Sequence, residues 1–297
     1  MSDIAIVRHA LRGQATVLTS YRRSGRGTPV ILLHGVGMNA SVWHPQIANL
    51  ETLYDVVAID LLGHGGSSLP PADARLSDYA EQVVALAASL KLRPAHVIGH
   101  SMGALIALEL ALSQAGLACS VTALNAVFSR TPEQRQAVER RAAAIEGAPA
   151  SAPMPPDEPI NRWFGDPLEP ALAAPAALVR DLLCAVDPVG YARTYRLFAT
   201  SDAAHRDRLP RLAVPALFLT GERDLSSTPA MSRAMAEMVP GARCGILGNA
   251  GHMMALTDAD EVNRRLRSFL TAVDRATAPG PINIEEGMDH GSSCGPD

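Results

Sequence analysis

The segment AHVIGHSMGALIALELAL, residues 95–112, constrains the fold more than any other part of the sequence. An apolar, strand-like run ends at a G-x-S-x-G pattern and a helix-like pattern begins directly after it, so the chain must turn sharply from strand to helix. Gly99 and Gly103 would let strand and helix approach without a Cβ clash, with Ser101 in a strained conformation at the tip. The pattern predicts a nucleophile elbow. A phosphate-binding loop is excluded, because neither G-x-x-x-x-G-K-[ST] nor G-x-G-x-x-G occurs.

Strand-like runs recur along the chain and alternate with helix-like patterns. They cover residues 4–9, 16–21, 30–34, 56–60, 96–100, 121–127, 216–220 and 243–247. Several are apolar throughout, as expected of strands that are buried on both faces of a parallel sheet. The alternation predicts an α/β protein with a doubly wound, mostly parallel eight-stranded sheet.

One long stretch interrupts this alternation. Residues 129–209 contain no strong strand pattern but include TPEQRQAVERRAAAI, in which Thr131 is a helix cap and Pro132 occupies the first helical position. We therefore expect residues 1–128 and 210–275 to form one core, with 129–209 as a helical insertion. Residues 276–297 are rich in Gly, Pro, Ser and acidic residues, which predicts a flexible tail.

Ser101 needs partners before it can act as a nucleophile. A base must take its proton and an acid must orient that base, and in elbow enzymes the chain order is Ser, acid, His. Asp224 follows the apolar run LFLTG, with Glu222 as a weaker candidate, and His252 lies in a Gly-bounded loop after the last strand. The sequence therefore predicts a catalytic triad of Ser101, His252 and Asp224.

An oxyanion hole is expected beside Ser101. One donor would be the backbone N–H of Met102, which follows the nucleophile, and the other that of Val36 in the loop LLHGVGMNA. The helix that begins at Met102 would direct its positive end to the same point. This chemistry needs only side chains, backbone donors and water, so no metal or organic cofactor is predicted.

Charge and composition exclude several classes of partner. The net charge is −4 and Lys and Arg form no dense cluster, which argues against nucleic acid. No run reaches the roughly 18 apolar residues of a membrane span. The four cysteines, Cys119, Cys184, Cys244 and Cys294, form no CxxC pair and suggest neither a zinc site nor a disulfide framework.

The N-terminal segment MSDIAIVRHALRGQ bears on location. Its charges break every apolar run, so it lacks the core of a signal peptide. Together with the cysteine usage this predicts a cytoplasmic protein. The sequence leaves open whether it is a monomer or a homodimer.

Five motifs together resemble the α/β-hydrolase superfamily. LLHGVG, DLLGHGGSS, GHSMGA, GERD and NAGHMMAL occur in the order of that family, between residue 30 and about residue 270. The resemblance implies an α/β-hydrolase fold in which the insertion is a helical cap above the active site. Some members take the acid from the end of the sixth strand, where this chain has Asn125, so Asp224 keeps the role.

Two segments of the insertion, NRWFGDP and DPVGYARTYRLFATSD, resemble cap segments of 3-oxoadipate enol-lactonases and their small-substrate relatives. Candidate pocket residues are His34, Arg162, Trp163, Tyr191, Arg196 and Met253. An arginine among them could hold a substrate carboxylate through two parallel hydrogen bonds. We therefore expect a small carbonyl compound as the substrate, an acidic one if an arginine takes this role.

The chemistry remains open among related reactions. A serine nucleophile argues against haloalkane dehalogenases and epoxide hydrolases, which use a carboxylate, and favours cleavage of a small ester, lactone or amide through an acyl-enzyme. Carbon-carbon bond hydrolases of meta-cleavage pathways use the same triad, although many have Trp where Met253 follows His252 here. Cofactor-free perhydrolases and small-ligand receptors built on this fold are also compatible with the motifs.

Overall fold

A single eight-stranded sheet organises the protein. The structure is a computed structural model that describes residues 4–13, 15–114, 116–149 and 155–277. The strands are β1 (Ile4–Leu11), β2 (Ala15–Gly25), β3 (Thr28–Leu33), β4 (Tyr54–Ile59), β5 (Ala95–His100), β6 (Ala118–Leu124), β7 (Ala216–Gly221) and β8 (Arg243–Leu247). Each of the predicted strands is present, and the predicted sheet is confirmed.

The strand order is β1-β2-β4-β3-β5-β6-β7-β8. Strand β2 runs antiparallel to both of its neighbours, and all other pairs of adjacent strands are parallel. Every residue of β4, β5 and β7 is buried, whereas the edge strand β1 alternates along its length. Apolar runs therefore mark the strands that helices cover on both faces, and alternation marks the edge.

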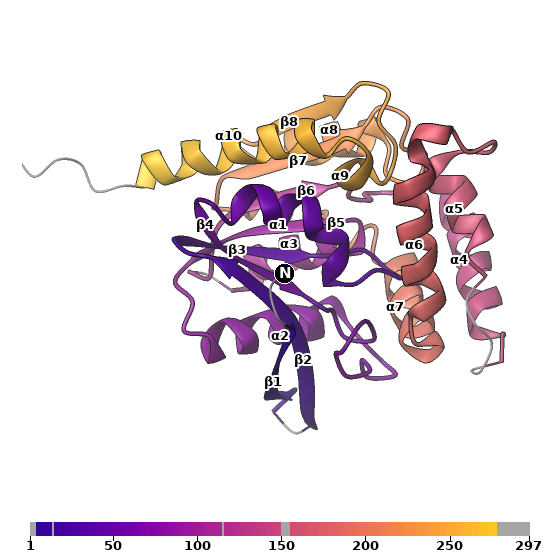
Figure 1. The fold of residues 1–297 in the computed structure, drawn as a ribbon, viewed down its shortest axis with the longest axis horizontal. Helices are drawn as coiled ribbons and strands as arrows, with labels where there is room; N and C mark the ends of the chain where they lie inside the picture. The colour runs from indigo at the N-terminus through magenta and orange to yellow at the C-terminus, as the bar shows by residue number, and fades with distance from the viewer. Residues whose placement is uncertain (1–3, 14, 115, 150–154, 278–297) are drawn as a thin grey trace, which may run out of the picture.

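Helices on both faces of the sheet complete the core (Figure 1). They are α1 (His44–Leu50), α2 (Leu76–Ser89), α3 (Met102–Ser113), α8 (Pro229–Met238), α9 (Met254–Thr257) and α10 (Ala259–Thr277), with a 3-10 turn, η1, at Ala40–Trp43. Helix α3 contacts β3, β5 and β6 and is buried along its first nine residues, so the elbow helix lies at the centre of the core. No helix in the described ranges has the length and apolar character needed to cross a bilayer.

The helices of the insertion gather at one end of the sheet, at the right of Figure 1. They are α4 (Pro132–Glu146), α5 (Asp157–Phe164), α6 (Ala173–Ala185) and α7 (Pro188–Thr200), with 3-10 turns η2 (Pro170–Leu172) and η3 (Leu209–Arg211). Thr131 caps α4 as predicted: its Oγ accepts from the Gln134 N–H at 3.2 Å, and the Gln134 side chain accepts from the Thr131 N–H at 3.0 Å. All four helices lie between β6 and β7 in the chain.

The cap is joined to the core through a close backbone contact. A Cβ on Gly190 of α7 would lie 2.3 Å from the carbonyl oxygen of Gly63 in the loop after β4, so only glycine allows the two segments to meet. Beside this contact, the hydroxyl groups of Tyr79 and Thr194 are 2.8 Å apart. Helix α7 is therefore fixed to the core near its first turn.

The predicted tail falls almost wholly outside the described residues. Helix α10 continues to Thr277, two residues past the predicted boundary at 275. Residues 278–297, including Cys294, are not described.

Candidate active site

Ser101 occupies the predicted turn between β5 and α3. Its φ of 54° and ψ of −114° are a strained combination for a residue with a side chain. A Cβ on Gly99 would lie 2.1 Å from the Gly103 carbonyl oxygen, and a Cβ on Gly103 would lie 2.1 Å from that of Leu33. The two glycines therefore allow helix α3 to pass directly over the ends of β3 and β5, and the tight packing holds Ser101 in its strained form.

Asp224 and His252 are hydrogen-bonded to one another. Asp224 follows β7 and His252 follows β8, two neighbouring strands, and His252 Nδ1 donates to Asp224 Oδ2 at 2.8 Å. The other carboxylate oxygen accepts from the backbone N–H groups of Ser226 and Ser227 at 2.8 and 2.9 Å. Burial opposes ionisation of Asp224, but the electrostatic attraction and hydrogen bond of the His252 ring, with the other donors, hold the pKa of Asp224 below the ordinary value.

Asn125 is a further part of this arrangement. It follows β6 with a φ of 49°, and its Nδ2 donates to Asp224 Oδ2 at 2.8 Å. The sequence marks Asn125 only as a replacement for the acid and does not reveal its role as a donor to it. The order of the strands could have revealed this role. Strands β6 and β7 are parallel neighbours, so the residues that follow them, Asn125 and Asp224, lie side by side.

His252 is enclosed by two other rings. His100 Nε2 donates to the backbone oxygen of His252 at 2.9 Å, and the two rings lie 5.0 Å apart. Burial lowers the pKa of His100 to about 3, so it is a neutral donor at pH 7. On the cap side the Trp163 ring stacks on the imidazole, with ring centres 5.6 Å apart and planes 25° from parallel. The cap therefore contacts the candidate base directly.

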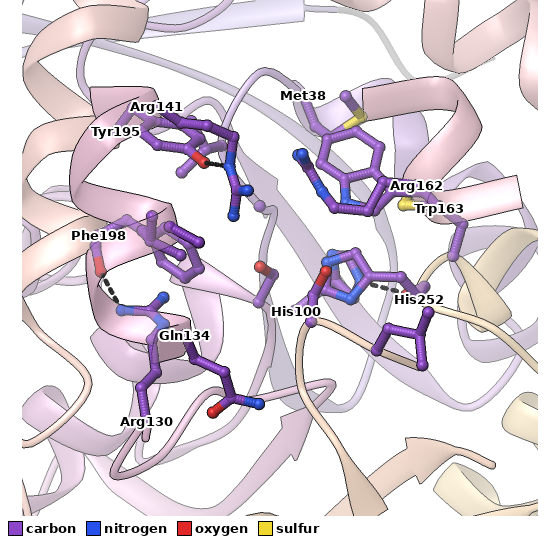
Figure 2. Close-up of a pocket in the computed structure, with 18 of the residues that line it drawn as sticks. Met38, His100, Arg130, Gln134, Arg141, Arg162, Trp163, Tyr195, Phe198 and His252 are labelled. Carbon is purple, nitrogen blue, oxygen red and sulfur yellow. Dashed lines mark hydrogen bonds between the residues drawn. The ribbon is translucent and has the colours of Figure 1, made fainter. Parts of the chain in front are cut away.

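A cavity of about 230 Å³ between core and cap contains both Ser101 and His252 (Figure 2). Core residues in its wall are Gly35, Val36, Met38, His100, Ser101, Leu225, Ser226, His252 and Met253. Cap residues in its wall are Arg130, Gln134, Ala137, Val138, Arg141, Arg162, Trp163, Tyr191, Tyr195 and Phe198. Four of the six predicted pocket residues are in these sets: Arg162, Trp163, Tyr191 and Met253.

The two predicted oxyanion donors lie on segments that border Ser101. Met102 is the first residue of α3, so its N–H has no acceptor within the helix. Val36 lines the cavity, and a Cβ on the preceding Gly35 would be 3.3 Å from the Ser101 Cβ. The positive end of α3 points to the same place. In the described part of the chain, no group of three or more His, Cys, Asp or Glu side chains is arranged to hold a metal ion.

His34 was expected in the pocket, and the structure corrects this. It is fully buried and absent from the cavity wall. Its Nδ1 donates to the Gly35 oxygen at 2.8 Å and its Nε2 accepts from the Leu61 N–H at 2.9 Å. Burial lowers its pKa to about 4. His34 therefore joins the loops after β3 and β4 as a neutral ring.

Arg196 is the second correction. Tyr191, Tyr195 and Phe198 of helix α7 line the cavity. They are four and then three residues apart, so they lie on one face of the helix. Arg196 lies off that face, with its side chain 56% exposed and 3.3 Å from Glu146. Sequence resemblance identified the helix but not its rotation.

The cavity residues from α4 were missed altogether. Gln134, Val138 and Arg141 have the same four-and-three spacing as the α7 residues. That spacing was visible in the sequence, but nothing in it indicated which face of α4 would meet the core.

The doubly wound sheet, the serine elbow and the cap define the class of protein. The model of a family described as "Alpha/beta hydrolase family" matches residues 30–265. The chain therefore belongs to the alpha/beta hydrolase family, and it is a hydrolase.

Individual relatives and structures agree with this membership. The chain is 34% identical over 250 residues to the (E)-2-((N-methylformamido)methylene)succinate hydrolase of Acinetobacter baylyi, covering 84% of this chain and 93% of the relative. It is 27% identical to 3-oxoadipate enol-lactonase 1 of the same species, covering 77% and 83%. The crystal structure of the enol-lactonase from Burkholderia xenovorans LB400 superimposes with a TM-score of 0.79 at 28% identity, covering 89% of this chain and all of the other.

Proposed function

We propose that this protein hydrolyses a small ester, lactone or related acyl compound through an acyl-enzyme on Ser101. The observation that carries the proposal is the 2.8 Å hydrogen bond from His252 Nδ1 to Asp224, in a cavity that Ser101 also lines. This bond fixes the neutral tautomer with a lone pair on Nε2, the nitrogen that a serine proton requires.

The first half of the reaction forms the acyl-enzyme. Ser101 Oγ attacks the carbonyl carbon while His252 Nε2 takes its proton, and Asp224 stabilises the resulting imidazolium. The negative charge moves to the carbonyl oxygen, where the N–H groups of Val36 and Met102 receive it. The intermediate collapses as His252 returns the proton to the leaving oxygen, which departs as an alcohol.

The second half repeats these roles with water. His252 takes a proton from a water molecule, whose oxygen attacks the acyl carbon. The second tetrahedral intermediate expels Ser101 Oγ, which regains a proton from His252, and a carboxylic acid leaves. Asp224 does not itself take the proton at any step, in accord with its lowered pKa.

The bond that is cleaved has two candidates. An ester or lactone is supported by the enol-lactonases among the relatives and structural neighbours. An N-acyl bond is the second candidate, because the relative with 34% identity carries a formamido group in its substrate name. The same triad serves both bonds, with His252 protonating oxygen in one case and nitrogen in the other.

The nucleophile is tested by labelling and by turnover. Wild-type protein should react covalently with a fluorophosphonate probe and hydrolyse p-nitrophenyl acetate or butyrate. Ser101→Ala should lose the label and reduce kcat by at least about 1,000-fold. Ser113→Ala, at the other end of α3, is the matched control and should retain both. Labelling of Ser101→Ala, or turnover within tenfold of wild type, would overturn the proposal.

Two further assays distinguish acyl hydrolysis from a receptor and from carbon-carbon bond cleavage. A burst of product without steady turnover on every acyl substrate would favour a receptor. Cleavage of dienone acids in preference to esters would favour carbon-carbon bond hydrolysis.

A further inference from the structure

Positive charge without a matching negative charge characterises the cavity wall. Three arginines line it, Arg130, Arg141 and Arg162, and the lining residues include no aspartate or glutamate. A small enclosed space with this balance favours an anion. The three arginines differ, however, in how far other groups of the protein already satisfy them.

Arg130 is used by the fold. Only 6% of it is exposed, and its Nη1 donates to the backbone oxygens of Phe198 and Ala199 at 3.3 and 3.0 Å. Asp202 Oδ1 lies 3.5 Å from the same nitrogen, and the guanidinium stacks 4.6 Å from the centre of the Phe198 ring. Arg130 therefore holds the end of α7 against the start of α4, and its ion-pair partner is Asp202, which it shares with Arg135.

Arg162 is also partnered. It forms an ion pair with Glu158, one turn earlier on α5. Its guanidinium lies 5.6 Å from the centre of the Trp163 ring, a cation–π distance. Arg162 thus supports the ring that stacks on His252, and Glu158 balances its charge.

Arg141 is the arginine whose charge remains unbalanced. Its Nε donates to the Tyr195 hydroxyl at 3.0 Å, and it forms no ion pair with any residue in the described ranges. This bond orients the side chain and leaves four Nη hydrogens, arranged in the planar fork that fits a carboxylate. Figure 2 shows the guanidinium extending from Tyr195 into the cavity.

A second donor lines the same cavity as Arg141. Tyr191 lines the same cavity, and burial raises the pKa of its hydroxyl, which therefore stays protonated and able to donate at neutral pH. Arg141, Tyr191 and Tyr195 also line a second cavity of about 410 Å³ between α4, α5 and α7. The second cavity does not include Ser101 or His252, so Arg141 lies on the side of the site away from the candidate base.

We propose that Arg141 is the specificity-determining residue of this site, binding a carboxylate carried by the acyl part of the substrate at the end remote from the cleaved bond, with the Tyr191 hydroxyl as second donor. The inference rests on the proposed function for the identity of the reacting group, but the binding of the anion can be measured without hydrolysis.

The test compares two substrates of nearly equal shape. Monoethyl succinate carries a carboxylate where ethyl levulinate carries a neutral methyl ketone. Wild type should have the higher kcat/KM on the succinate ester. Arg141→Gln should lower kcat/KM on that ester by about 50-fold, mainly through KM, and change ethyl levulinate by less than threefold. Activity on the neutral ester shows at the same time that the variant is folded.

Two other variants locate the effect. Arg180→Gln removes an arginine of the cap whose side chain is 43% exposed and lines neither cavity, and it should leave both substrates unchanged. If Arg162→Gln, rather than Arg141→Gln, selectively impairs the succinate ester, the assignment to Arg141 is wrong. Equal losses on both esters in Arg141→Gln would also overturn it.

A binding measurement separates this inference from the proposed function. Calorimetric titration of monoethyl succinate into Ser101→Ala should give saturable binding, weakened about 50-fold in Ser101→Ala/Arg141→Gln. Binding that is equal in the two proteins, or absent from both at tens of millimolar ester, would refute the role of Arg141 whatever the catalytic assays show. Loss of hydrolysis with Arg141-dependent binding intact would instead refute the acyl-enzyme proposal alone.

Discussion

The core and cap sides of the cavity are built in different ways. On the core side, Ser101 is fixed by backbone packing so close that a Cβ added to Gly99 or Gly103 would lie 2.1 Å from a carbonyl oxygen, and Asp224 accepts four hydrogen bonds. On the cap side, Arg141 is held by a single bond to Tyr195. The core thus places the groups that would carry the reaction by backbone packing, whereas the cap offers side chains from helix faces. We infer that chemistry is determined by the core and selectivity by the cap.

Asp224→Asn should give the largest effect. Ser226 and Ser227 would keep the amide oxygen on their side, which turns the NH₂ group toward His252 Nδ1 and Asn125 Nδ2. The imidazole would then favour the wrong tautomer, and kcat should fall by about 10⁴-fold. Steady-state kinetics on the best ester measure this. Glu222→Gln, the weaker candidate from the sequence, should change kcat less than twofold, and an Asp224→Asn enzyme within tenfold of wild type would exclude the triad.

Acid should weaken the core. Burial lowers the pKa of His34 to about 4 and those of His64 and His100 to about 3. Between about pH 6.5 and these values the unfolded chain binds protons that the folded protein does not, so the free energy of unfolding falls as pH falls. At pH 5 the loss should be on the order of 2 kcal/mol per histidine.

Urea unfolding at pH 7.5 and pH 5 measures this dependence. His34→Gln should reduce it by about 2 kcal/mol, because one of these protonation sites is gone. Equal stability of the wild-type protein at the two pH values would contradict the prediction.

Glycine substitutions test the packing difference directly. Gly103→Ala should lower the free energy of unfolding by about 3 kcal/mol, because its Cβ would meet the Leu33 oxygen at 2.1 Å. Gly147→Ala, at the end of cap helix α4 with a φ of −78°, should change it by no more than about 0.5 kcal/mol. Urea denaturation compares the two variants, and equal losses would remove the distinction between core and cap.

Arg196→Gln should have the smallest effect. Its pair with Glu146 is exposed, and such pairs contribute about 0–1 kcal/mol. We expect kcat/KM on monoethyl succinate within twofold of wild type, in contrast to Arg141→Gln. A selective loss of activity on this ester would show that Arg196 contributes to the pocket after all.

The features that could be predicted from the sequence are those that a short stretch of residues specifies. The inner strands are marked by short apolar runs and the edge strand β1 by alternation, and the elbow is marked by the two glycines on either side of Ser101. Thr131 could be identified as a cap because it hydrogen-bonds only three residues away. These features could be predicted because the sequence pattern that marks each of them spans only a few residues.

The remaining features depend on contacts that the sequence does not display. Whether Arg141 or Arg196 faces the cavity depends on how α4 and α7 are rotated against each other. His34 follows β3 in a family motif, yet the loop after β4 supplies its partner, Leu61. Asn125 stands out in the sequence at the end of a strand, but its bond to Asp224 joins residues 99 positions apart.

The Trp163 ring of the cap stacks on the His252 ring of the core, so the surroundings of the candidate base belong to both parts of the protein. Exchanging the cap for that of another hydrolase would also remove one wall around the imidazole, so a chimera should need an aromatic ring at the end of its α5 equivalent. Modular redesign of this protein is thus limited at α5 as well as at the contact of α7 with the core, and selectivity can be altered through α4 with less disturbance than through α5.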